Sequence, residues 1–235
     1  MTLSTFRITG NLSKLMTGAL FTLSSLILSS CSTKETPVPE FASLMMVNTS
    51  PTPATYNIYV NNAAANSGAI PFGGALPYLK VNTGEQSIKF TTASSTESLI
   101  TKKVNIENNR AYSLFLIGKE DKLDYLVIKD EITQAPKEKA LIRFINLSPD
   151  AGALNLGIKE AAVLISDKAY KENSAFIEIE AKTQTLQIID KVTGSVKSEL
   201  VNEEIKAGGI YTILSIGMMT PTGLEQKAIA KKITN

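Results

Sequence analysis

An internal repeat is the feature that most constrains the fold of this 235-residue chain. The segment 42–51, ASLMMVNTSP, matches the segment 140–149, ALIRFINLSP, at an offset of 98 residues. A second pair of segments, 111–118 (AYSLFLIG) and 210–217 (IYTILSIG), follows in the same order at an offset of 99. Two matched blocks in the same order and at nearly the same spacing indicate duplicated domains rather than a chance similarity of short strands.

Each copy has the pattern of a series of short strands. Ile88 and Phe90 alternate with Lys89 and Thr91, and this period of two, bounded by turn residues, predicts half-buried strands. The expected strands lie near 43–48, 55–61, 77–81, 86–92, 99–105, 110–118 and 124–130, and near 140–146, 153–158, 162–166, 174–180, 184–190, 196–202, 209–216 and 225–233.

About seven strands in a domain of roughly 95 residues is typical of an immunoglobulin-like β-sandwich. The chain has no Trp and a single Cys, so the hallmark of true immunoglobulin domains is missing. We therefore predict an all-β protein with two tandem immunoglobulin-like β-sandwich domains, at 41–132 and 139–235, joined by a short linker.

The only cysteine, Cys31, has the setting of a lipidation site. It follows Leu28-Ser29-Ser30 and the apolar stretch 15–28, and Arg7 and Lys14 precede that stretch. The stretch is too short and too polar for a permanent membrane helix, but it suits a signal peptide. We expect cleavage before Cys31 and acylation of its thiol. The alternative is an ordinary signal peptide, or a weak membrane helix, with an incidental cysteine.

This assignment makes residues 1–30 a lipoprotein signal peptide and 31–40 a tether that reaches ~30 Å at most. We expect the N-terminal lipid to hold the protein in the bacterial cell envelope, at the outer membrane, because Ser32 is not the Asp of an inner-membrane retention signal. Lys34-Glu35 faintly resembles a charged surface-export signal, and a solvated linker is the alternative. The periplasmic and the surface face of the membrane both stay open.

Composition argues against catalysis and against nucleic acid as a partner. There is no His, and lipidation would use Cys31, so His-based and thiol-based nucleophilic sites and His-ligated metals are excluded. Without the leader the chain has 22 basic and 22 acidic side chains, and no basic stripe for nucleic acid is visible. We expect no enzyme activity, no metal and no cofactor. Glu178 and Glu180 could form a carboxylate pair, but two outward charges on a strand are usually a solvated face.

The repeated string Asn-x-Ser-Pro has a structural interpretation of its own. It comprises Asn48, Ser50 and Pro51 in the first copy and Asn146, Ser148 and Pro149 in the second. Asn and Ser side chains bond to nearby backbone and Pro fixes φ, so we expect turns after a core strand. The functional alternative is a polar ligand site at one end of the sandwich.

Two apolar loops are candidate partner sites. One contains Phe72 and Tyr78, and the other is a hairpin tip with Met218 and Met219. Exposed apolar loops can mark contact surfaces, whereas side chains directed into the core are the alternative.

The opening strand followed by Asn-x-Ser-Pro resembles domain of unknown function 4397, which is common in lipoproteins of Bacteroidetes and often occurs in tandem. The second copy keeps the string Ser148-Pro149-Asp150-Ala151, whereas the first departs from it with Ser50-Pro51-Thr52-Pro53. The resemblance spans about 42–233. It implies a β-sandwich and a cell-envelope location, and no activity.

Three functions remain in view. The first is a cell-envelope lipoprotein with a non-catalytic binding or structural role and a protein or glycan partner. The second is a carbohydrate-binding accessory lipoprotein of a glycan uptake system, which needs exposed aromatic platforms in a chain with no Trp and seven Tyr. The third is an enzyme that relies on carboxylates alone. The sequence leaves the ligand, the oligomeric state and the relative orientation of the domains open.

Overall fold

The computed structural model describes residues 40–132, 134 and 136–235. The predicted signal peptide, Cys31 and all of the tether except Glu40 lie outside the described residues. Within the described residues the fold is built from strands, with a single 3-10 turn at Glu120–Lys122. Among these residues, no helix has the length and the apolar character that a membrane span requires.

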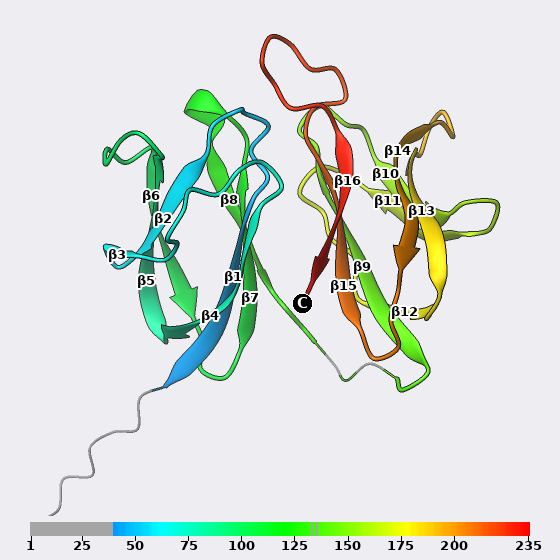
Figure 1. Cartoon of the computed structure of the whole chain (residues 1–235), viewed down its shortest axis with the longest axis horizontal. Coiled ribbons are helices and arrows are strands. Elements are labelled where there is room, and N and C mark those ends of the chain that lie inside the picture. The colour runs from blue at the N-terminus through cyan, green and yellow to red at the C-terminus, as the bar shows by residue number, and fades with distance from the viewer. Residues whose placement is uncertain (1–39, 133, 135) are drawn as a thin grey trace, which may run out of the picture. The chain divides into compact units, whose positions relative to one another are not determined.

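Residues 40–132 form the first sandwich (Figure 1). Its two sheets have the strand orders β4-β1-β7-β8 and β3-β2-β5-β6, and β1 runs parallel to β7. The strands are β1 (Phe41–Asn48), β2 (Tyr56–Val60), β3 (Ala63–Ala64), β4 (Ala75–Asn82), β5 (Gly84–Thr92), β6 (Ile100–Ile106), β7 (Ala111–Ile117) and β8 (Asp124–Lys129).

Residues 139–235 form the second sandwich with the same plan. Its sheets have the orders β12-β9-β15-β16 and β11-β10-β13-β14, and β9 runs parallel to β15. The strands are β9 (Lys139–Leu147), β10 (Leu154–Ile158), β11 (Val163–Lys168), β12 (Ile177–Glu180), β13 (Thr183–Asp190), β14 (Val196–Glu204), β15 (Ile210–Ile216) and β16 (Ile229–Thr234). The predicted all-β class with two tandem sandwiches is confirmed.

Two predicted strands begin later than expected: β12 starts at Ile177 rather than near 174, and β16 starts at Ile229 rather than near 225. The segment 225–233 was predicted as strand throughout, but β16 starts only at Ile229. The backbone N–H groups of Glu225 and Gln226 bond instead to the carbonyls of Thr222 and Pro51, which holds this part of the chain in a loop.

Each sandwich has its own core between its two sheets, and a third cluster joins the sandwiches. We call this third cluster the shared core. Its buried members come from β1, β7 and β8 on one side and from β9, β15 and β16 on the other. They are Met45, Val47, Phe115, Ile117, Ile128, Ile145, Leu147, Leu214, Ile216 and Ile233.

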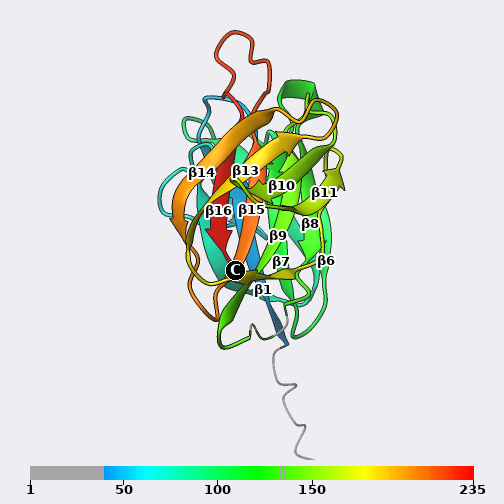
Figure 2. The ribbon, with the colours of Figure 1, turned by 90° about the vertical axis from the view of Figure 1, so that its right-hand side faces the viewer.

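The shared core explains why the strands have two kinds of sequence pattern, namely unbroken apolar runs and alternating apolar and polar residues. The inner sheets, which contain β1 and β9, bury both faces, so these strands are apolar at successive positions. The outer sheets keep one face in solvent, and strands such as β5 and β13 alternate. In Figure 2 the outer strands β13 and β14 lie in front of β9, β15 and β16.

Candidate functional site

The Asn-x-Ser-Pro strings form matching turns at the ends of β1 and β9. The N–H of Ser50 donates to Asn48 Oδ1 over 3.1 Å, and the N–H of Ser148 donates to Asn146 Oδ1 over the same distance. Both Asn side chains are buried, and Asn48 Nδ2 also donates to the Ile70 carbonyl. Side-chain bonds of this kind fix a turn locally.

Each Ser then ties its turn to the neighbouring parallel strand. Ser50 Oγ donates to the carbonyl of Gly118 over 2.7 Å, and Ser148 Oγ lies 2.9 Å from Ser215 Oγ. Gly118 and Gly217, which end the second repeated segment, have φ values of 71° and 93°. A Cβ at either position would collide with backbone, of Lys122 and of Lys227 respectively, so both positions need glycine.

One loop connects the two turns. We call residues 218–228 the end loop. The N–H of Gln226 donates to the carbonyl of Pro51 in the first turn over 3.0 Å. Asp150, next to the second turn, accepts from the N–H groups of Met219 and Thr220, each over 2.8 Å. The end loop therefore joins the two sandwiches into one surface at this end.

A pocket of about 360 Å³ lies beside the end loop, and we call it the end pocket. Lys171 Nζ lies 5.5 Å from the centre of the Tyr170 ring, and burial raises the pKa of Tyr170. Lys119 forms an ion pair with Glu225 of the end loop. The lining residues are Gly118, Lys119, Lys122, Pro149, Asp150, Tyr170, Lys171 and Met218. Ammonium groups, an aromatic ring and a thioether together suit a small polar ligand with an apolar face.

The four residues of the predicted partner loops are only partly buried, but all of them contact the rest of the protein. Phe72 and Tyr78 pack against the shared core. Met219 packs against the core of the second sandwich, and Met218 lines the end pocket. The lysines and Tyr170 of the pocket were not singled out from the sequence, because no motif surrounds them.

A buried ion pair crosses between the sandwiches at the edge of the shared core. Arg143 of β9 is 2% exposed, and its Nη2 lies 2.6 Å from Oδ1 of Asp130, whose side chain is fully buried. Arg143 Nε also donates to Thr212 Oγ1 over 2.8 Å. Asp130 Oδ2 accepts from Ser113 Oγ and from the hydroxyl of Tyr78 over 2.8 and 2.7 Å. The sequence signal for this pair was the single charge inside the apolar string ALIRFINL.

The environment of Tyr78 predicts a stability loss at high pH. Burial, reinforced by the Asp130 carboxylate, raises the pKa of Tyr78 from 10.0 to about 12. Because the folded state favours the neutral phenol, this contribution to stability is intact below pH 10 and is lost as pH rises from about 10 to about 12. Urea unfolding across this range should therefore show a steeper loss for the wild type than for Tyr78→Phe. Equal slopes would mean that Tyr78 ionises as it does in the unfolded chain.

The part of the chain that the structure describes offers no obvious catalytic or metal centre. No group of three or more acidic, His or Cys side chains is close enough there to hold a metal ion. Glu178 and Glu180 are both exposed on β12, and Glu178 pairs with Lys139 over 2.9 Å. This arrangement is that of a solvated strand face.

Comparison with solved structures finds two carbohydrate-binding proteins at low similarity. A streptococcal virulence factor described for α-glucan binding aligns over 74% of this chain and 92% of its own, at 12% identity and a TM-score of 0.23. The family 26 carbohydrate-binding module of Eubacterium rectale Amy13K, solved with maltoheptaose, aligns over 83% and 96%, at 8% identity and a TM-score of 0.25. TM-scores this low carry no inference about a ligand.

No curated protein sequence matches the chain. A family model does match, and it extends from β1 through the first sandwich into β10. Residues 42–157 match the model of domain of unknown function DUF4397, and over this span the chain is similar to that family.

Proposed function

We propose that this protein is a lipid-anchored cell-envelope protein with a non-catalytic binding role, and that the end pocket and the end loop form its contact surface. The observation that carries the proposal is the end loop, which bonds to the turns of both sandwiches and so builds one rigid surface from two domains.

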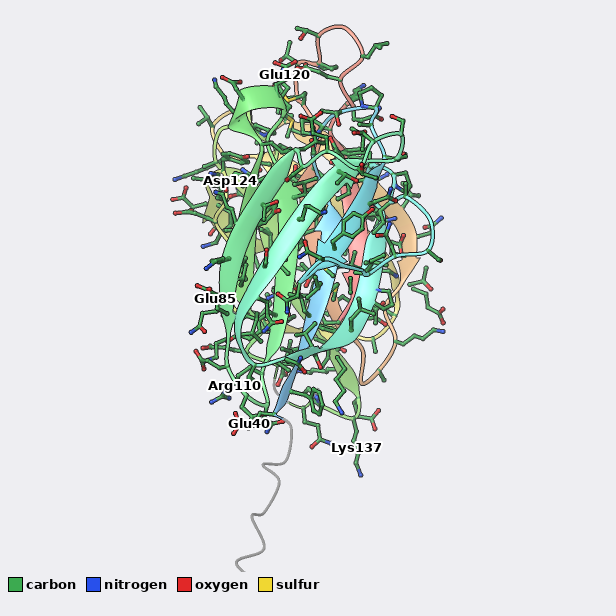
Figure 3. The ribbon with its side chains drawn as sticks, turned by 90° about the vertical axis from the view of Figure 1, so that its left-hand side faces the viewer. Glu40, Glu85, Arg110, Glu120, Asp124 and Lys137 are labelled. Carbon is green, nitrogen blue, oxygen red and sulfur yellow. The ribbon has the colours of Figure 1, made fainter. Side chains whose placement is uncertain are left out.

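The direction of β1 supports this assignment of ends. The chain enters β1 at Phe41 and reaches the first turn after Asn48, a run of about 25 Å at the usual rise of a strand. In Figure 3, Glu40, Arg110 and Lys137 lie at the entry end, and Glu120, next to the end pocket, lies at the other. A lipid on Cys31 with a nine-residue tether would keep the entry end near the bilayer. The end pocket would then face away from the membrane.

The chemistry of the end pocket supports binding rather than reaction. Both oxygens of Asp150 accept backbone N–H groups, so this carboxylate is committed to holding the end loop. Lys119 is paired with Glu225. Among the described lining residues, no hydrogen bond joins a nucleophile to a base, which is the arrangement that nucleophilic catalysis relies on.

The glycan-binding alternative has one observation in its favour, the ring of Tyr170 in the end pocket. Against it, every aromatic side chain in the described residues is at least partly buried, whereas a glycan platform needs well-exposed rings. A glycan array separates the two. Binding that is lost in Tyr170→Ala and kept in Tyr59→Ala, a control on the first outer sheet, would establish the alternative.

The anchor has a test of its own. Cys31→Ala should abolish labelling by radioactive palmitate and move the protein from the membrane fraction to the soluble fraction, because the thiol is the only acylation site in the chain. Ser30→Ala, which keeps a small residue before the cysteine, is the matched control and should label normally. Palmitate incorporation by Cys31→Ala would disprove the lipid anchor.

A further inference from the structure

The two sandwiches meet through equivalent faces of the repeat. Positions equivalent by the repeat and by strand register lie on both sides of the shared core. The equivalent pairs are Met45 with Arg143, Tyr78 with Phe176, Ser113 with Thr212, Ile128 with Ile233 and Asp130 with Asn235. Such an arrangement raises the question of why the first sandwich pairs with the second rather than with a first sandwich of another chain.

The charges at these positions are divided between the copies. The first sandwich supplies the acid, Asp130, and has Met45 where the second has Arg143. The second sandwich supplies the base and has Asn235 where the first has Asp130. Each copy therefore carries one buried charge that it cannot neutralise with the equivalent face of an identical copy.

Contacts across the interface give each buried charge the opposite charge that its own copy lacks. Arg143 pairs with Asp130 over 2.6 Å, and its Nη2 donates to Ser113 Oγ of the first sandwich over 3.3 Å. The guanidinium group also stacks on Phe176 of its own sandwich, at 4.7 Å from the ring centre. The ion pair and the bond to Ser113 form only when a first sandwich faces a second.

We propose that the Arg143–Asp130 pair is a pairing-specificity device, which selects the other sandwich of the repeat and rejects a like copy. Two first sandwiches facing each other would bury two carboxylates with no cation, and two second sandwiches would bury two guanidinium groups with no anion. An unpaired buried charge is strongly unfavourable. Rejection of wrong partners by uncompensated charge is a general route to specificity. The device keeps this apolar face from joining like copies in neighbouring molecules.

The repeat itself supplies a neutral version of the interface for the test. Arg143→Met and Asp130→Asn replace each charged residue by the one that stands at the equivalent position of the other copy. Met45 and Asn235 already fit at those positions, and apolar replacement of a complete buried ion pair is often nearly neutral for stability. The double variant should therefore fold while losing the discrimination between like and unlike copies.

The experiment uses the full chain with a protease site inserted after Gln134, in the linker. The cut protein is unfolded, refolded and examined by native mass spectrometry, which distinguishes the two sandwiches by mass. In the wild type, like pairs should be at least about tenfold rarer than unlike pairs. In the double variant, like pairs should rise toward random mixing. The control, Lys103→Met with Glu85→Gln, removes an exposed ion pair and should behave as the wild type.

Abundant like pairs in the wild type, or unchanged exclusive pairing in the double variant, would overturn the proposal. Should the cut sandwiches fail to refold, thermal melts of the uncut chain decide. Each single variant should then lower the melting temperature by about 10 °C, while the double variant stays within a few degrees of the wild type. Losses that simply add in the double variant would contradict the proposal.

Discussion

Phe115→Ala should lower the free energy of unfolding by about 3–5 kcal/mol, the usual cost of truncating a fully buried Phe. Phe115 is 0% exposed and lies in the shared core, where it packs on the second sandwich as well as on its own. The cavity would open between two rigid sheets that cannot collapse into it. Urea unfolding followed by far-UV circular dichroism should show one transition, shifted as a whole to lower urea.

Leu99→Ala is the matched control, because Leu99 is 49% exposed and should change the free energy of unfolding by less than about 0.5 kcal/mol. The outcome that would contradict this prediction is a urea unfolding curve with two transitions, only one of which is shifted by Phe115→Ala. That result would show that 41–132 and 139–235 unfold as independent domains, and that the shared core couples them only weakly.

Arg143→Met should lower the free energy of unfolding by a similar amount, about 3–5 kcal/mol, for a different reason. Methionine fills most of the space of the arginine, so little cavity forms. The loss comes from Asp130, whose buried carboxylate would keep its bonds from Ser113 and Tyr78 but lose its only cation within ion-pair distance among the described residues. Chemical denaturation of the purified variant measures the effect directly.

Lys103→Met provides the comparison, since the Lys103 side chain is 69% exposed and its ion pair with Glu85 is screened by water. We expect a change of less than about 1 kcal/mol there. An equally small effect for Arg143→Met would mean that water reaches Asp130 and that the interface is not sealed at this edge.

The strands and their grouping could be predicted from the sequence, because both depend on local patterns. Alternation around Ile88 and Phe90 identified an outer strand, and the repeat identified two equivalent domains. The shared core could not be predicted in the same way. An unbroken apolar run such as 44–47 shows that a strand is buried on both faces, but does not show which sheet covers the second face.

The polar contacts between the two sandwiches could not be predicted from the sequence, for a related reason. A lone Arg143 in an apolar strand signals a buried partner, yet nothing local identifies Asp130 on the far side of the linker as that partner. Residues 225–228 of the end loop were mistaken for part of a strand, because the bond from Gln226 to Pro51 spans a long distance in the chain. Short-range patterns cannot report such contacts, and the end pocket depends on them.

Burial of the inner sheets on both faces also sets how fast different parts of this chain can diverge. A strand with a solvent face can accept substitutions at every second position, whereas β1, β7, β9 and β15 have no free face. The two pairs of segments in which the duplication is still recognisable, 42–51 with 140–149 and 111–118 with 210–217, cover nearly all of these four strands and the turns that end them. The part of the repeat that is still recognisable thus marks the strands that could accept the fewest substitutions.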